Sequence, residues 1–295
     1  MLGPFEVKSR LAPLELFSSA LLFGLSAWLA KRATRELSGS EVAFWRFVIG
    51  LVFVFGQLWV RQVPLRFQRY DILFLRGALG AGAGLLYFLA LAEIPVGNAT
   101  LLNCTSPIFA ALAAVVFLRE RLPIARGAAL GVAGLGVVLV VTGQGATLGG
   151  EYGWQAAALA SGVMAGGAVV TIRAARRYNG PWEIFFFFNF MGLLATAPFA
   201  FNAWVWPDGN TWALLLVMGT VLTVAQILMN HALGLADASY AAALIPLTPV
   251  TSFTLGFAFD GEAVTVLSVA GGVLTLLGVT CVALQDARGK PLPRP

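Results

Sequence analysis

Apolar residues fill ten long runs of the chain, and short polar segments separate these runs. The runs cover approximately residues 14–30, 42–60, 72–92, 97–118, 127–143, 153–172, 183–201, 211–234, 238–258 and 264–284. A helix needs about 20 mainly apolar residues to cross the hydrocarbon core of a bilayer. The pattern therefore predicts an all-α polytopic membrane protein with ten transmembrane helices. We expect the first run to be kept as a span rather than cleaved as a signal peptide.

The two halves of the chain carry the same pattern at a constant offset, the repeat shift, which places Ala99 on Ala241. Residues 99–120, an apolar run with one proline that stops at a glutamate, correspond to residues 241–262. Identical pairs at this shift are Arg35/Arg177, Glu41/Glu183, Phe44/Phe186, Gly50/Gly192, Gly77/Gly219, Pro107/Pro249, Glu120/Glu262 and Gly136/Gly278. A constant shift with matched charges and prolines indicates a duplication. We expect one repeat over residues 1–142, a second over 143–284 and a cytoplasmic tail over 285–295.

Five spans per repeat make the second half enter the membrane from the opposite face, so the two repeats are predicted to be inverted. Fourteen Lys and Arg residues fall in the loops and termini of one side, and three fall on the other: Lys31, Arg32 and Arg35. Because positive charge marks the cytoplasmic side, both termini are expected to be cytoplasmic, in an inner membrane. Glu120 then lies at the cytoplasmic face and Glu262 at the external face. Inverted repeats are typical of transporters.

Composition supports the membrane class and excludes several others. The chain is 59% hydrophobic and 11% charged, with mean hydropathy +0.83, whereas soluble domains have about 25% charged residues. The net charge of +5 is explained by membrane orientation, so no nucleic acid is expected as a partner. Cys104 and Cys281 lie in apolar runs, and a single histidine, His231, argues against a metal site. We expect no cofactor, no catalytic residues, and a monomer or weak homodimer in the lipid bilayer.

Charged residues are scarce inside the predicted spans. All fourteen Asp and Glu residues fall in loops or near span ends, which disfavours a cation/proton antiporter with a buried carboxylate. No Lys or Arg is expected at mid-membrane, which disfavours sugar phosphates. Arg46 is expected to snorkel or to pair with Glu41. His231 lies near the cytoplasmic end of its span and is a poor proton relay, so transport is predicted to be facilitative.

Neutral polar and aromatic side chains remain as candidates for a central site. Prolines in apolar helices are tolerated where protein or a water-filled cavity surrounds the break, and three are expected to bend helices: Pro107, Pro246 and Pro249. The candidate substrate contacts near them are Trp28, Tyr87, Asn103, Ser106, Gln226, Asn230, His231 and Tyr240. Such a set suits a neutral or zwitterionic solute. The alternative is that these side chains only form hydrogen bonds between packed helices.

Three motifs resemble one transporter family. FWRF at residues 44–47 resembles the "RF" signature early in the second span of EamA-type carriers of the drug/metabolite transporter superfamily. SPIFAALAAVVFLRE (106–120) and TPVTSFTLGFAFDGE (248–262) are similar to that family's proline-to-glutamate segments. Within the superfamily the chain most resembles bacterial aromatic amino acid exporters. The resemblance implies ten helices in two inverted five-helix halves, with a central cavity between spans 1, 3, 4, 6, 8 and 9.

These observations lead to one preferred hypothesis and its alternatives. The preferred hypothesis is a transporter that exports small metabolites, above all neutral or aromatic amino acids, by alternating access. The alternatives are a transporter of another solute such as a nucleoside or sugar, a membrane enzyme acting on a lipid-linked substrate, and a non-transporting structural subunit. The inverted repeat favours transport, because a symmetry that exchanges the two membrane faces serves alternating access.

Overall fold

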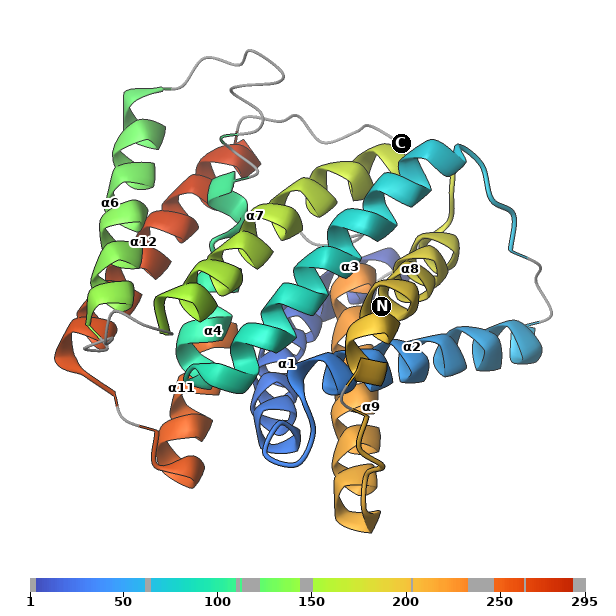
Figure 1. The fold of residues 1–295 in the computed structure, drawn as a ribbon. Coiled ribbons are helices and arrows are strands. Elements are labelled where there is room, and N and C mark those ends of the chain that lie inside the picture. The colour runs from blue at the N-terminus through green and yellow to red at the C-terminus, as the bar shows by residue number, and fades with distance from the viewer. Residues whose placement is uncertain are drawn as a thin grey trace.

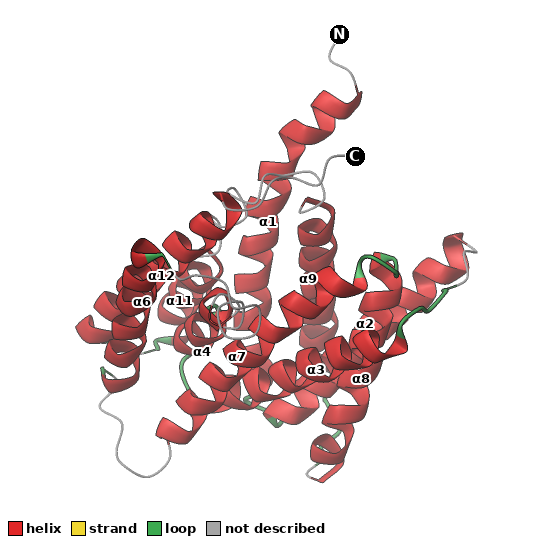
Figure 2. Ribbon diagram, turned by 90° about the horizontal axis from the view of Figure 1, so that it is seen from above, coloured by secondary structure: helices red, strands yellow, loops and turns green. Residues whose placement is uncertain are grey.

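The computed structural model describes residues 4–61, 65–109, 112, 123–143, 151–202, 204–232, 247–262 and 264–288. Within these ranges the secondary structure is helical, without strands (Figure 2). The helices are α1 (Pro4–Ala33), α2 (Gly39–Arg61), α3 (Tyr70–Glu93), α4 (Val96–Asn103), α6 (Ile124–Thr142), α7 (Glu151–Ala175), α8 (Pro181–Asn202), α9 (Gly209–Ala232), α11 (Leu247–Asp260) and α12 (Val266–Arg288) (Figure 1).

Six of these helices are long and apolar enough to cross a membrane. The crossing segments are Leu14–Ala33, Gly39–Val60, Tyr70–Glu93, Tyr152–Ile172, Trp182–Asn202 and Gly209–Met229. At about 1.5 Å per residue, segments of 20 to 24 residues match a hydrocarbon core of about 30 Å. Shorter apolar helices follow at Gly127–Thr142 and Val266–Val282. The prediction of an all-helical polytopic membrane protein is confirmed, while the count of ten spans and their inversion stay predictions.

The chain around Pro107 is broken rather than bent. The sequence predicts one helix over residues 97–118, but α4 ends at Asn103 and a turn occupies Cys104 and Thr105 before helix resumes at Ser106. The hydroxyl of Thr105 donates to the carbonyl of Leu102 at 2.5 Å and closes this turn. Pro107 thus lies in the first turn of the segment that follows, where its missing N–H leaves no hydrogen bond unmade.

The proline pair of the second half is only partly described. Pro249 is the third residue of the described part of α11, Leu247–Asp260. Pro246 lies outside the described residues, and so does Tyr240. The expected bends at Pro246 and Pro249 therefore stay predictions.

Contacts between helices recur at the repeat shift. α3 packs on α7, and α1 packs on α9. At the repeat shift α1 corresponds to α7 and α3 corresponds to α9, so the two contacts are equivalent. The same holds for single residues. A Cβ on Gly77 would meet the side chain of Met191, and a Cβ on Gly219 would meet Ile49, which is the counterpart of Met191. α6 and α12 lie side by side at one end of the molecule (Figures 1 and 2).

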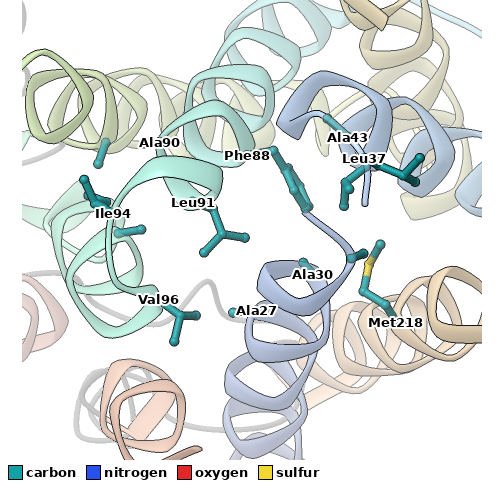
Figure 3. Packing of buried hydrophobic residues seen from close by; sticks show 14 of the residues in the cluster. Ala27, Ala30, Leu37, Ala43, Phe88, Ala90, Leu91, Ile94, Val96 and Met218 are labelled. Carbon is teal, nitrogen blue, oxygen red and sulfur yellow. The ribbon is translucent and has the colours of Figure 1, made fainter. Parts of the chain in front are cut away.

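A core of small residues joins α1 to its neighbours near its C-terminal end. Ala27, Ala30 and Ala33 are almost completely buried against α2, α3 and α9, where larger partners such as Phe88 and Met218 fill the remaining space (Figure 3). Small side chains let helix backbones approach closely, which supplies much of the packing energy in lipid. This core fixes α1 against α3, and it therefore determines where Trp28 and Tyr87 lie.

Candidate functional site

Trp28 takes part in a polar cluster that ties α1 to α11. Its indole Nε1–H donates to the carboxylate of Asp260 at 2.5 Å. The same carboxylate lies 2.5 Å from Nη2 of Arg35 and 3.8 Å from Nε of Arg32, and its side chain is only 3% exposed. The polar end of Trp28 is thus engaged with a residue 232 positions away. Only its ring, 5.5 Å from that of Phe259, remains for other contacts.

Two further contacts close the same end of the molecule. The ammonium group of Lys31 donates to the carbonyl oxygens of Ala92 and Ile94, each at 3.0 Å. The backbone N–H of Val96 donates to both carboxylate oxygens of Glu262, at 3.1 and 3.0 Å. Burial raises the pKa of Glu262 above its ordinary value, although the Val96 N–H and the charge of Lys31 oppose the rise. These contacts join α1 to the C-terminal end of α3, and α4 to the residues after α11, at the face that the charge distribution predicts to be external.

Tyr87 and Asn103 make hydrogen bonds within the helix bundle. The hydroxyl of Tyr87 lies 3.0 Å from that of Thr100, which in turn donates to the carbonyl of Val96 at 2.7 Å. The amide of Asn103 donates to the hydroxyl of Ser161 at 2.9 Å and so links α4 to α7. Both arrangements fit the helix-packing alternative.

The other candidates are spread over the structure. Ser106 is half-buried directly after the break in α4. Asn230 and His231 belong to the last turn of α9, but their side chains lie outside the described part of the structure. Gln226, one turn earlier, lines a pocket with residues of α2 and α8. The described part of the candidate set therefore does not converge on one cavity: Trp28 belongs to one cluster and Gln226 to another.

The pocket around Gln226 lies between α2, α8 and α9 and contains Arg46. Its cavity volume is about 10 Å³, and it is lined by Arg46, Gly50, Phe185, Asn189, Leu222, Thr223 and Gln226. Gly50 is needed here, because a Cβ at this position would overlap the side-chain oxygen of Asn189. The amide of Asn189 donates to the carbonyl of Phe185 at 2.7 Å, which fixes its orientation. The lining is thus polar on one side and apolar on the other.

Two arginines pack around Phe188 inside the bundle, and the sequence analysis missed this arrangement. The guanidinium carbon of Arg46 lies 4.3 Å from the ring centre of Phe47 and 4.7 Å from that of Phe188. The guanidinium carbon of Arg76 lies 4.5 Å from the ring centre of Phe188, and Arg76 is only 7% exposed. Each arginine lies about 10 Å along its helix from the first residue.

The structure corrects one expectation about charge. Arg46 does not pair with Glu41, whose carboxylate instead accepts hydrogen bonds from Ser38 and from the backbone N–H of Val205. The absence of Lys and Arg at mid-membrane stays a prediction, but Arg76, in the second turn of α3, is buried. Arg76 could have been found from the sequence, since it interrupts an apolar run of small residues at positions 72–92. What the sequence could not show is that both arginines meet at Phe188.

The electrostatics of the arginine pair are unbalanced. Nη1 of Arg46 and Nε and Nη1 of Arg76 are buried without a hydrogen-bond partner. Among the described residues the ion pairs involve Arg32, Arg35 and Arg69, and none involves Arg46 or Arg76. An arginine at a helix centre in lipid costs about 2.5–3.5 kcal/mol by insertion scales, and each cation–π contact offsets about 0.5–2 kcal/mol. The region is therefore electropositive and favours an anion.

The chain is similar to known membrane transporters over most of its length. The sequence model of the EamA-like transporter family matches residues 11–142 and again residues 153–284. The chain is 32% identical to the pseudopaline exporter of Pseudomonas aeruginosa, over 92% of this chain and 94% of that protein. It is 28% identical to a probable terminal-alkyne amino-acid exporter of Streptantibioticus cattleyicolor, over 79% of each chain.

Two other comparisons extend this result. A riboflavin transporter of Brucella anthropi is 28% identical over 73% of this chain and 80% of its own. A solved crystal structure with 23% sequence identity superimposes with a TM-score of 0.67, covering 94% of this chain and 98% of that chain. The last comparison concerns the fold alone. The family match and the named relatives identify a transporter rather than an enzyme.

Proposed function

The chain belongs to the EamA-like transporter family, and we propose that it exports small metabolites of the amino-acid class, with neutral and aromatic amino acids among them. The transporter class itself follows from the family. The observation that carries the proposed substrate class is the similarity to two exporters, one of which is named for an amino acid. The transported molecule crosses an inner membrane by alternating access, and no enzymatic step is required.

Alternating access is supported by the repeated contacts of the two halves. Every one of the ten predicted apolar runs overlaps a described helix, and the family match occurs twice. Helix contacts such as α3 on α7 and α1 on α9 correspond to each other at the repeat shift. Five spans per half would invert the second half, and the two halves could then exchange their conformations when the cavity changes its open side.

The direction of export is proposed from the similarity to two exporters. The contacts of Asp260, Glu262 and Lys31 join helices at the face that the positive-inside rule predicts to be external. A carrier closed by these contacts would exchange solute with the cytoplasm. Breaking them would then open it to the outside.

Facilitative transport is proposed because no proton-exchanging group is found among the described residues inside the spans. The acidic residues of the closed end, Asp260 and Glu262, lie at helix ends, and His231 lies one residue before the end of α9. The His231→Gln variant should therefore keep most of its flux. Loss of a pH-driven flux in this variant would contradict the proposal and identify His231 as the coupling group.

The test is transport by the purified protein in liposomes. Vesicles loaded with a labelled neutral amino acid, at equal pH on both sides, should release it faster than protein-free vesicles. Phenylalanine, tryptophan, leucine and alanine would cover aromatic and aliphatic side chains. Release that begins only when a pH gradient is imposed would overturn the facilitative part. No release of any amino acid would overturn the substrate class.

A second candidate solute is a flavin. The similarity to riboflavin transporters favours this candidate. The same vesicles loaded with riboflavin, which can be followed by its own fluorescence, distinguish the two solutes. Riboflavin release without amino acid release would favour the second candidate.

A further inference from the structure

We propose that Arg46 and Arg76 form a binding site for the carboxylate group of the exported solute. The site lies between α2, α3, α8 and α9, and this inference rests on the proposed function. It assigns an anion-binding role to two residues that the family match and the relatives' names leave without one. It also replaces the expectation that the spans bind their solute with neutral groups alone.

Both guanidinium groups keep hydrogen-bond donors without a partner. Their guanidinium carbons lie 4.7 Å (Arg46) and 4.5 Å (Arg76) from the ring centre of Phe188. The N–H donors of arginine lie in the plane of the group and point away from its edge. Three of these nitrogens, Nη1 of Arg46 and both Nε and Nη1 of Arg76, are buried and unpartnered. A carboxylate accepts two such N–H groups at once, in the bidentate arrangement that arginine favours.

The space beside Arg46 is small, with a cavity volume of about 10 Å³, which is about the room of one water molecule. A carboxylate therefore enters only if the side chains that line this space move apart. Thr223 and Gln226 from α9 add polar groups to its lining. In the described residues no carboxylate forms an ion pair with either arginine. The anion would therefore have to come from outside the described bundle.

Comparison of the two halves shows that the packing alone does not require these arginines. At the repeat shift Arg46 corresponds to Phe188, and Arg76 corresponds to Met218. Met218 is fully buried and Phe188 is nearly so, so an apolar side chain fills the equivalent place well. The two halves therefore differ in charge at equivalent buried places. Since an apolar side chain fills the same place in the other half, this difference favours a role in binding.

The experiment measures carboxylate binding on purified full-length protein in nanodiscs of zwitterionic phosphatidylcholine, which supplies no anionic headgroup. Unfolding temperature is followed while propionate or its neutral analogue propionamide is added, with chloride used to hold the ionic strength constant. L-phenylalanine and L-phenylalaninamide form a second pair of probes. The wild-type protein should be stabilised by the acid of each pair and not by the amide. Inorganic phosphate is the third probe.

The variants are Arg46→Gln and Arg76→Gln, with Arg69→Gln as the matched control. Arg69 is exposed and pairs with Asp71 outside the bundle. Each glutamine variant removes the charged N–H donors of one arginine. Its apparent affinity for the carboxylate should fall about tenfold to a hundredfold, and the control should keep the wild-type affinity. Arg46→Lys and Arg76→Lys preserve the charge without the bidentate geometry, and they provide folded variants in which a partial loss is expected.

Two results would overturn the assignment. One is a carboxylate response that is unchanged in both glutamine variants. The other is a response of the wild-type protein to inorganic phosphate but not to propionate, which would assign the arginines to a phosphate group such as that of a lipid. Vesicle transport separates this inference from the proposed function. A propionate response without amino acid release overturns the proposed substrate class and keeps the site, whereas release that is normal in both glutamine variants overturns the site and keeps the exporter.

Discussion

Neutralising Asp260 should open the end of the bundle at which α1 meets α11. In the Asp260→Asn variant the side chain keeps its shape, but its two short hydrogen bonds, from Trp28 and Arg35, lose their charge assistance. A hydrogen bond to a charged group contributes about 1.5–3 kcal/mol and a neutral one about 0.5–1.5 kcal/mol. Because Arg35 is 55% exposed, its share is discounted to less than about 1 kcal/mol. The closed state should then lose about 1–2 kcal/mol in total.

This loss is large compared with the energy that separates the states of a carrier. Conformations that exchange during function differ by a few kcal/mol, and about 1.4 kcal/mol changes their ratio tenfold. The open state of Asp260→Asn should therefore be populated about 5 to 30 times more than in the wild-type protein.

Cys104 provides a native reporter for this opening. It lies in the break after α4, and its side chain is partly buried. In a Cys281→Ala background, an impermeant maleimide added to whole cells should label Cys104 about 5 to 30 times faster in Asp260→Asn than in the wild-type protein. Asp208→Asn is the matched control, because Asp208 caps the N-terminus of α9 through Thr211 and is not among the groups that bind Asp260. Equal labelling rates in Asp260→Asn and in the control would refute the reasoning.

Three further outcomes are expected. Gly50→Ala should lower the free energy of unfolding by about 1–3 kcal/mol, as overpacking does, because the new methyl group would overlap the side chain of Asn189; chemical unfolding in mild detergent measures this, and an unchanged stability would contradict the described contact. Burial raises the folded-state pKa of Glu262 above its ordinary 4.5, so its contribution to stability is present below pH 4.5 and is lost as the pH rises toward the folded-state pKa. The melting temperature is measured against pH for the wild-type protein and for Glu262→Gln. Over this pH range the melting temperature of the wild-type protein should fall relative to that of the variant; a relative rise would show that the Val96 and Lys31 contacts outweigh burial. Cysteines introduced at Glu120 and Glu262 should be labelled from opposite faces, and labelling of both from one face would exclude inverted repeats.

The membrane-spanning helices were predictable because their signal is local. A run of about 20 apolar residues is sufficient evidence for a span, and the six clear spans all fall on runs identified from the sequence. The break at Cys104 and Thr105 was not predicted. A proline shows where a helix is weakened, but neighbouring contacts decide whether the helix bends or stops.

The candidate site was less predictable because its contacts join distant segments. Trp28 was expected to line the cavity, yet the partner of its N–H group is Asp260, in the other half of the chain. Arg46 was assigned to the interface because a lone arginine near a span end usually extends toward water. Only the folded arrangement places it against Phe188, beside Arg76. Hydropathy describes each span by itself and carries no information about which faces meet.

The contact of α2 with α8 bears on how far a bound group would move during the transport cycle. Gly50 contacts Asn189, and at the repeat shift Gly192 makes the equivalent contact with Phe47. With the two repeats inverted as predicted, a pseudo-twofold axis would relate the halves, and such reciprocal contacts would lie on it. Arg46 lies over the ring of Phe188, its own counterpart, and would then lie at this axis. A motion that swaps the conformations of the halves displaces points far from the axis and leaves points on it nearly in place. An anion held there would stay almost still while access to it passes from one side of the membrane to the other.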